Sequence, residues 1–201
     1  MTGEPHAHRL VSRRRRYAGP VFTVYTDEIT MPGGGVATRD LLEHVGAVGV
    51  VAYDGDGRVV LVRQYRHPVR RRLWELPAGL LDVTGEDPVV AAARELAEEA
   101  DLVAARWDLL VDLHTTPGMS DEMIRVFLAR ELTPVPADER HTRHDEEADL
   151  ETGRFDLDEA AAMVFAGAIT NGPTVAGLLA AARARELGWR VLRPADAPLT
   201  R

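Results

Sequence analysis

The chain has 201 residues, of which 45% are hydrophobic and 28% charged, so it is long enough and apolar enough to fold around a sizeable core. It contains no cysteine, which excludes disulfides, thiolate nucleophiles and metal sites built on sulfur. All 24 basic residues are arginine, so lysine-dependent phosphate loops and Schiff-base chemistry are also excluded, and the net charge of −8 disfavours nucleic acid and anionic membranes as partners.

The N-terminal 40 residues predict a small strand unit. Residues 1–20 are polar and include the arginine run 13–16, which is either a solvated extension or an arm that contacts a phosphate or a partner subunit. They lack the apolar stretch of a signal peptide, and no segment reaches the roughly 18 apolar residues of a spanning helix, so we expect a cytoplasmic protein. Residues 21–25 and those around Ile29 are β-branched or aromatic and predict strands, before a turn at 31–35.

Two apolar, β-branched runs, 46–53 and 59–65, flank a glycine-containing turn at 54–57 and predict a β-hairpin. A short strand-like segment follows at 74–79, where Pro77 limits its length. Asp87 is a good helix N-cap and Pro88 suits the first helical position, so we expect a helix from Pro88 to about Ala100.

The second half of the chain mixes strands and helices without a regular βαβ rhythm. It predicts strands at 109–113, 124–129 and 154–157, a charged loop at 139–151, and helices at 158–166 and 173–187. We therefore expect an α+β, or mixed α/β, fold with a catalytic domain over residues 41–190 and a tail over 191–201.

The predicted helix at 88–100 carries the most informative residues. Glu95, Glu98 and Glu99 have i, i+3 and i, i+4 spacing, so their carboxylates crowd one face, where like charges repel. Such a face is either a solvated surface or a site for a hard divalent cation such as Mg²⁺ or Mn²⁺. The preceding loop contains Gly79 and Gly85, which allow close backbone approach, and this context favours a metal site.

This loop and helix resemble the Nudix box, the signature of hydrolases that cleave nucleoside diphosphates linked to another moiety. The matching residues are Gly79, Glu86, Arg94, Glu95, Leu96, Glu98, Glu99 and Leu102. Two positions depart from the family pattern: six residues rather than five separate Gly79 from Glu86, and Asp101 replaces the glycine that ends the helix. The set of acids is complete.

The resemblance extends to the ADP-ribose pyrophosphatase branch of the family, particularly its actinobacterial members. The residues that carry it lie at 31–35, 64–67, 72–82 and 145–149, together with Pro117, which follows Leu102 by 15 positions as in that branch. The resemblance implies a Nudix α/β/α sandwich with a small N-terminal antiparallel strand unit, and a homodimer. It also implies metal-dependent hydrolysis of ADP-ribose to AMP and ribose 5-phosphate.

The resemblance implies a role for each acid of the site. Glu95 and Glu99 would be the principal ligands of Mg²⁺ or Mn²⁺, with Glu98 close by and the Ala78 carbonyl completing the shell, while Arg94 would orient the acids. A base that is not bound to metal would activate or position water, and the acidic loop provides it as Glu147 or, alternatively, Glu146.

The implied substrate contacts lie in three further segments. These contacts are Arg66, Arg63, Glu75, Pro117, Gly118 and Met119. Phe22, Trp74 and Tyr65 either stack on adenine or pack within the protein, and His44, His67 and His114 have no spacing typical of a zinc site, so we expect them to be structural.

Two other functions remain open. A Nudix pyrophosphatase acting on another nucleoside diphosphate sugar would use the same chemistry, and the position of Pro117 argues against it. A non-catalytic ADP-ribose sensor is disfavoured because such proteins usually lose an acid of the box, and every acid is present here.

Overall fold

The computed structural model describes residues 7–143 and 149–199. They divide into two compact units. The first, here called the strand unit, comprises Met1–Gly46 with His114–Met123, and the second, the sandwich unit, comprises Ala47–Leu113 with Ile124–Arg201.

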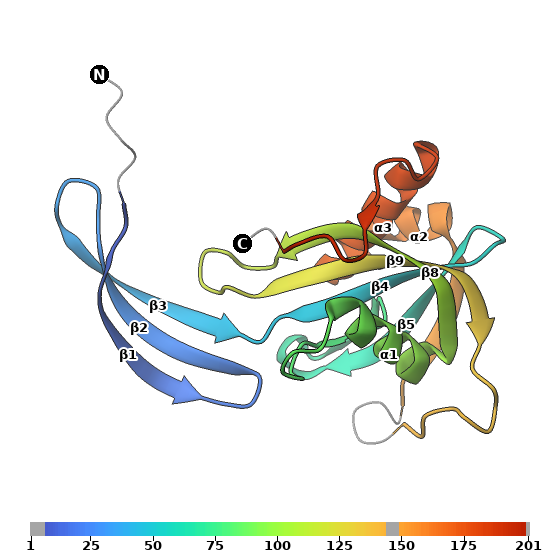
Figure 1. Ribbon diagram of the computed structural model, residues 1–201, viewed down its shortest axis with the longest axis horizontal. Helices are drawn as coiled ribbons and strands as arrows, with labels where there is room; N and C mark the ends of the chain where they lie inside the picture. Colours follow the sequence, from blue (N-terminus) through green and yellow to red (C-terminus); the bar gives the residue numbers. More distant parts are fainter. Residues whose placement is uncertain (1–6, 144–148, 200–201) are drawn as a thin grey trace. The chain divides into compact units, whose positions relative to one another are not determined.

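The strand unit is an antiparallel sheet in the order β1-β2-β3, shown in blue in Figure 1. Its strands are β1 (Leu10–Ala18), β2 (Phe22–Thr30) and β3 (Val36–His44). The arginine run 13–16 is exposed, as expected of a solvated segment, but it lies within β1 and pairs along β2. Strand β3 follows the predicted turn at 31–35 and is not among the strands predicted from the sequence.

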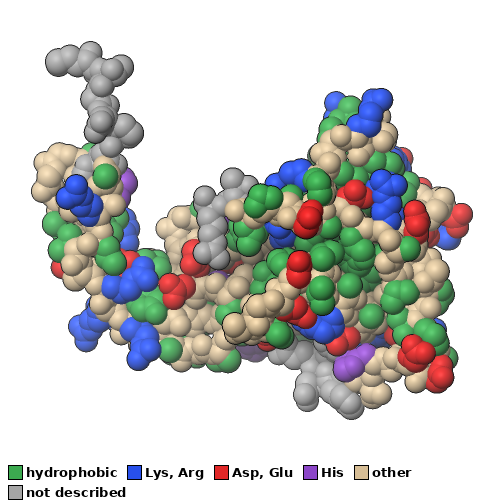
Figure 2. Space-filling view, viewed as in Figure 1, with side chains coloured by type: hydrophobic (Ala, Val, Ile, Leu, Met, Phe, Trp, Pro, Cys, Tyr) green, Lys and Arg blue, Asp and Glu red, His purple; other side chains and the backbone are tan. Residues whose placement is uncertain are grey.

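Arginines project from this unit, and the blue side chains that Figure 2 shows on it are all arginine because the chain has no lysine. Arg13 donates to both oxygens of Asp27, with Nε–Oδ1 and Nη2–Oδ2 distances of 2.9 and 2.8 Å. The hydrogen bond to Asp27 outweighs burial and raises the pKa of Arg13. Among the described residues of the strand unit, Asp27 alone is buried, so the sheet has no apolar core of its own.

The sandwich unit is built on an eight-stranded mixed sheet. Along the main path the order is β10-β5-β4-β9-β8-β11, with β6 paired to β5 and β7 paired to β4. The strands are β4 (Ala47–Tyr53), β5 (Arg58–Arg66), β6 (Arg71–Glu75), β7 (Ala78–Leu80), β8 (Leu102–His114), β9 (Met123–Pro134), β10 (Glu151–Asp156) and β11 (Arg193–Pro194). The central strands β4 and β9 run parallel, and β4 pairs antiparallel with both β5 and β7.

Helices cover both faces of this sheet (Figure 1). On one face, α1 (Pro88–Ala100) packs against alternate residues of β4, including Val48 and Val50. On the other face, α2 (Leu157–Phe165) and α3 (Gly172–Glu186) pack against Val51 and Leu61. Because side chains alternate along a strand, the apolar β4 serves both layers at once. The predicted mixed α/β sandwich with an N-terminal strand unit is confirmed. Within the part of the chain that the structure describes, no helix is long and apolar enough to cross a membrane.

The predicted hairpin is present as β4 and β5, and its turn has a clear cause. The Asp54 carboxylate accepts hydrogen bonds from the backbone N–H groups of Asp56 and Arg58, and Gly57 has φ +91°. Burial raises the pKa of Asp54, but these hydrogen bonds and the Arg58 charge lower it by more, so its pKa lies below the usual value. Strand β8 begins at Leu102 rather than 109, and of its first six residues only Leu102 is buried.

Candidate active site

Helix α1 begins and ends where the sequence predicts. Asp87 caps its start, because its carboxylate accepts a hydrogen bond of 3.0 Å from the Val89 N–H, and Pro88 occupies the first turn. Asp101 ends the helix in the left-handed conformation with φ 53°, and its N–H donates to the Leu96 carbonyl. The aspartate therefore takes the conformation that the family's glycine would take.

Two of the box carboxylates are buried on the face of α1 that meets β7. Glu95 is 7% exposed and Glu99 4%. The Ala78 N–H donates to Glu99 Oε2 at 2.9 Å. A Cβ added to Gly79 would lie 2.1 Å from Glu95 Cδ, so the backbone of β7 approaches that carboxylate as closely as only glycine permits.

Arg94 gathers the acids of the loop and the helix. Its Nη1 lies 2.5 Å from Glu95 Oε1 and 3.4 Å from Glu98 Oε2, and its Nη2 lies 3.2 Å from Glu86 Oε2. The hydrogen bond to Glu86 and the charges of Glu95 and Glu86 outweigh burial and raise the pKa of Arg94. The guanidinium is therefore charged at every accessible pH and contacts three acids that would otherwise repel one another.

The segment before β7 is fixed by the opposite helical layer. The Leu76 N–H donates to Thr174 Oγ1 at 3.0 Å, and the Thr174 hydroxyl and N–H both donate to Asn171 Oδ1. Thr174 is fully buried. Asn171 followed by Gly-Pro is a helix-start signal that sequence reasoning could have found, but the contact with Leu76 joins residues 98 positions apart and left no local signal.

Of the predicted substrate-binding residues in the sandwich unit, Arg66 and Glu75 are joined. Arg66 donates through Nε and Nη2 to the Glu75 carboxylate, at 2.7 Å for the closest pair. Glu75 is 2% exposed, whereas 42% of the Arg66 side chain is exposed. A buried acid thus holds a half-exposed guanidinium. Arg63 lies over the Trp74 ring and 3.6 Å from Glu151.

The remaining predicted site residues lie elsewhere. Pro117, Gly118 and Met119 form a turn in the strand unit, where Met119 donates to the Thr116 carbonyl and accepts from the Leu42 N–H. Glu146 and Glu147 lie outside the described residues. The flanking residues are bound at either end: Arg143 pairs with Asp101, and Asp149 pairs with Arg72.

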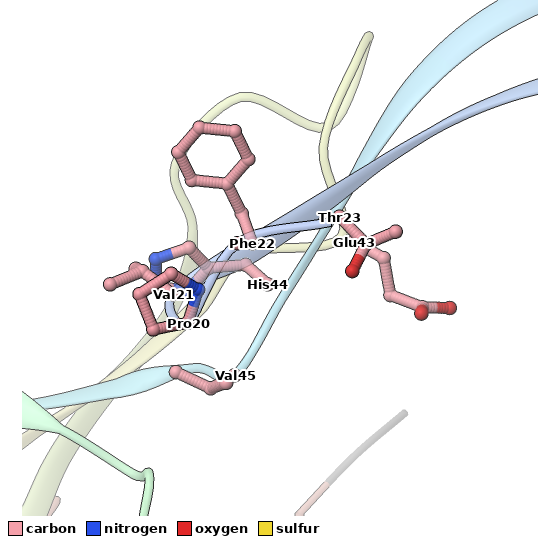
Figure 3. A pocket seen from close by; sticks show the side chains of 8 residues that line it. Pro20, Val21, Phe22, Thr23, Glu43, His44 and Val45 are labelled. Carbon is pink, nitrogen blue, oxygen red and sulfur yellow. The ribbon is translucent and has the colours of Figure 1, made fainter. Parts of the chain in front are cut away.

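The aromatic candidates differ in their surroundings. Trp74 packs edge-on against Phe155, with ring centroids 5.0 Å apart, as part of the core. Tyr65 is exposed beside His67. Phe22 lines a cavity of about 150 Å³ in the strand unit, whose lining side chains Figure 3 shows, with Pro20, Glu43 and His44 among them.

His44 has the structural contacts expected of it. Its Nδ1 accepts from the Gly46 N–H at 3.0 Å, and its Nε2 lies 3.7 Å from Glu122 Oε1. Within residues 7–143 and 149–199, no three histidine, aspartate or glutamate side chains converge as a ready-made metal cage.

The donors on α1 nevertheless suit one class of metal. Mg²⁺ typically binds to one or two carboxylates, keeps several waters and completes its shell with substrate phosphates. Glu95 and Glu99 are two buried carboxylates on adjacent turns of one helix face, beside the glycine of β7. This donor set fits Mg²⁺ or the similar Mn²⁺, because such a site is completed by the substrate rather than by the protein alone.

Residues 43–176 match the family model described as NUDIX domain. The chain belongs to the Nudix family. The resemblance read from the box residues is thereby confirmed, and the helix that carries the box is α1.

Similar proteins extend the match across nearly the whole chain. It is 48% identical to a protein of Mycobacterium tuberculosis named "ADP-ribose pyrophosphatase", over 95% of this chain and 90% of that protein. A protein of Bacillus subtilis with the same name is 33% identical over 78% of this chain and 82% of its own length. A solved structure named "Crystal structure of ADP compounds hydrolase" has a TM-score of 0.80, covering 94% of this chain and all of that one. At 20% identity, this last match shows the fold.

Proposed function

We propose that this Nudix protein hydrolyses the diphosphate of ADP-ribose, consuming one water and releasing AMP and ribose 5-phosphate. The observation that carries the proposal is the pair of buried carboxylates on α1, in a chain 48% identical to an ADP-ribose pyrophosphatase. The complete set of box acids separates this proposal from a non-catalytic sensor.

The chemistry requires positive charge on the diphosphate and a base for the attacking water. Glu95 and Glu99 would hold Mg²⁺ or Mn²⁺, with Glu98 nearby and the Ala78 carbonyl as a further donor. A divalent cation held there supplies the charge that neutralises the diphosphate oxygens. Arg94 holds the acids in place and orients them, since it contacts Glu86, Glu95 and Glu98.

For the base we propose Glu147, with Glu146 as the alternative. Both belong to the acidic segment between Arg143 and Asp149, and neither belongs to the box, so either would be free of the metal. A carboxylate that does not ligate metal retains the basicity needed to accept a proton from water.

For substrate binding we propose Arg66, supported by Glu75, with a lesser contribution from Arg63. A guanidinium binds phosphate oxygens in bidentate fashion, and the buried Glu75 fixes the orientation of Arg66. Arg63 already contacts Trp74 and Glu151. The turn at Pro117, Gly118 and Met119 is proposed to contact the ribose end.

We also propose a homodimer formed through the strand unit. Every residue of β1 is exposed, and Leu10, Val11 and Tyr17 are each more than half exposed. A single-layer sheet with no apolar core needs a covering surface for stability, and a second copy supplies one. Sedimentation equilibrium would give twice the 22.1 kDa chain mass, whereas a monomer at micromolar concentration would contradict the proposal.

The function is tested by incubating purified protein with ADP-ribose, ADP-glucose or GDP-mannose, in Mg²⁺, in Mn²⁺ or with chelator. Release of AMP or GMP is followed. We expect metal-dependent AMP release that is fastest from ADP-ribose. Glu99→Gln should lower kcat by on the order of 100-fold or more, because one of the two buried carboxylates loses its charge.

Glu159→Gln is the matched control, since Glu159 is an exposed helix glutamate on α2, and it should leave the rate unchanged. Faster turnover of another sugar nucleotide would retain the chemistry and reject ADP-ribose as the preferred substrate. Tight ADP-ribose binding without turnover would make the protein a sensor.

A further inference from the structure

The C-terminus of α1 is capped by a residue from a distant segment. The last carbonyls of a helix have no partner within it. Arg143 donates a hydrogen bond to each of two such carbonyls: its Nε donates to the Glu98 carbonyl at 3.1 Å and its Nη2 to the Glu99 carbonyl at 2.9 Å. The last turn of α1 has no basic residue of its own, so this guanidinium also provides the positive charge that the helix dipole favours there.

Asp101 anchors the same guanidinium. Arg143 Nη2 lies 3.0 Å from Asp101 Oδ2, and both side chains are largely buried, at 22% and 26% exposed. A glycine at this position would satisfy the left-handed backbone equally well but would offer no carboxylate. The departure from the family pattern at Asp101 thus comes with an arginine that uses it.

The two carbonyls that Arg143 binds belong to Glu98 and Glu99, whose side chains lie in the candidate metal site. The Glu99 side chain is held at its tip by the Ala78 N–H, and Arg143 holds the peptide from which it leaves. A glutamate side chain has several rotatable bonds, so holding both its backbone and its carboxylate restricts where the carboxylate points.

We propose that Arg143 is a positioning residue for the carboxylates of Glu98 and Glu99, and that Asp101 acts through it. The inference rests on the proposed function, because it assigns these carboxylates to the metal. Groups that orient metal ligands typically contribute about 10-fold to 100-fold to metal affinity. A cap that served only helix stability would leave the metal affinity of the folded protein unchanged.

The test compares wild type, Arg143→Ala, Arg143→Lys and Asp101→Gly by calorimetric titration of the full-length protein with Mn²⁺, without substrate. We expect Arg143→Ala to weaken Mn²⁺ binding by about 10-fold, and to raise the Mn²⁺ concentration for half-maximal hydrolysis by the same factor. The KM for ADP-ribose should be little changed. Arg143→Lys keeps the charge but loses the fork, so its affinity should be intermediate.

The double variant Asp101→Gly with Arg143→Ala measures whether the effects of Asp101 and Arg143 on Mn²⁺ binding depend on each other. If Asp101 acts through Arg143, the double variant should bind Mn²⁺ no more weakly than Arg143→Ala alone. Arg183→Ala is the control, because Arg183 forms an exposed ion pair with Glu186 on α3 and should have no effect.

Wild-type Mn²⁺ affinity in a folded Arg143→Ala protein, with only a lower melting temperature, would overturn the inference. Should Arg143→Ala fail to fold, the same comparison is made with Arg143→Lys, for which unchanged affinity overturns it equally. A wild type that binds Mn²⁺ but hydrolyses none of the three nucleotides would reject the proposed function, while the calorimetric comparison would still decide the role of Arg143.

Discussion

At the scale of single residues, the Nudix pattern specifies which residues the site needs, and the structure shows the contacts that explain why. Gly79 is part of the Nudix pattern, and the structure gives a steric reason for it: the Glu95 carboxylate occupies the place that any side chain would take. Arg94 likewise has a specific task, because it contacts three acids from a loop and two turns of α1. Neither residue needs to touch the substrate to be required.

Gly79→Ala should therefore impair catalysis more than folding. The new Cβ would lie 2.1 Å from Glu95 Cδ, so the carboxylate or the β7 backbone must move. A displacement of about 1 Å at a reacting site can cost roughly 100-fold, and we expect a loss of kcat of that order. Steady-state kinetics and thermal unfolding would be measured together.

Gly55→Ala is the matched control for this change. An added Cβ at Gly55 would meet no atom within 4 Å, and the φ of Gly55 lies outside the left-handed region, so both rate and melting temperature should stay at wild-type values. Full activity of Gly79→Ala would show that Glu95 tolerates displacement and has no ligand role.

At the scale of elements, α1 is the best example of a local sequence signal that determines a structure. Asp87 and Pro88 define its start, and the helix runs from Pro88 to Ala100 as predicted. Its first turn contains no acidic residue, so Asp87 is the side chain that offsets the positive end of the helix dipole. The stability of the box helix should consequently depend on a residue that the box pattern leaves unspecified.

Asp87→Ala should destabilise the protein by about 1 kcal/mol, because the Val89 N–H loses its acceptor. Asp87→Asn should lower the stability by only a few tenths of a kcal/mol, because asparagine caps about as well as aspartate. Urea denaturation of the two variants beside wild type measures the difference. Equal losses in both would mean that charge, rather than the capping hydrogen bond, stabilises this end of the helix.

The sequence predicts helices and strands well where the signal is local. The hairpin 46–65 and the three helices follow from apolar runs, glycines and capping residues that lie within a few positions of one another. Strand β1 could not be predicted from its own residues, since all nine are exposed and it exists because β2 pairs with it. The contacts of Thr174 with Leu76 and of Arg143 with Asp101 join distant segments, and only the fold brings them together.

At the scale of the whole molecule, buried ion pairs and hydrogen bonds hold the C-terminal tail against strands of the sandwich unit. Arg125 on β9 is 3% exposed and donates to Asp112 on β8 and to the carbonyls of Ala197 and Pro198 in the C-terminal tail. Arg193 on β11 adds a second ion pair to Asp112. One carboxylate thus helps to join three strands and the tail.

The Asp112 carboxylate should make the stability of the folded protein depend on pH. Burial raises the pKa of Asp112, but the hydrogen bonds and charges of Arg125 and Arg193 lower it more, so its pKa in the folded protein lies below the usual value. The stability it contributes is fully present above the unfolded pKa of about 3.9 and is lost as the pH falls through the folded value. Asp112→Asn should therefore be less stable than wild type at neutral pH, and the gap should narrow below about pH 4.

Chemical denaturation between pH 2 and pH 7 would test this, with Asp138→Asn as the control, because Asp138 is exposed and forms no ion pair among the described residues. A gap between wild type and Asp112→Asn that is constant over the whole range would show that the carboxylate contributes by packing rather than by charge.

The division of the chain into units is not a division into consecutive segments. The strand unit takes residues 114–123, from the end of β8 to the start of β9. These residues bind β3: the Leu42 N–H donates to the Met119 carbonyl, and the His44 N–H donates to Asp121. Removing residues 1–45 would therefore not yield a minimal enzyme. It would leave the 114–123 turn with backbone groups that have lost their partners, and a shortened protein would need that turn redesigned as well.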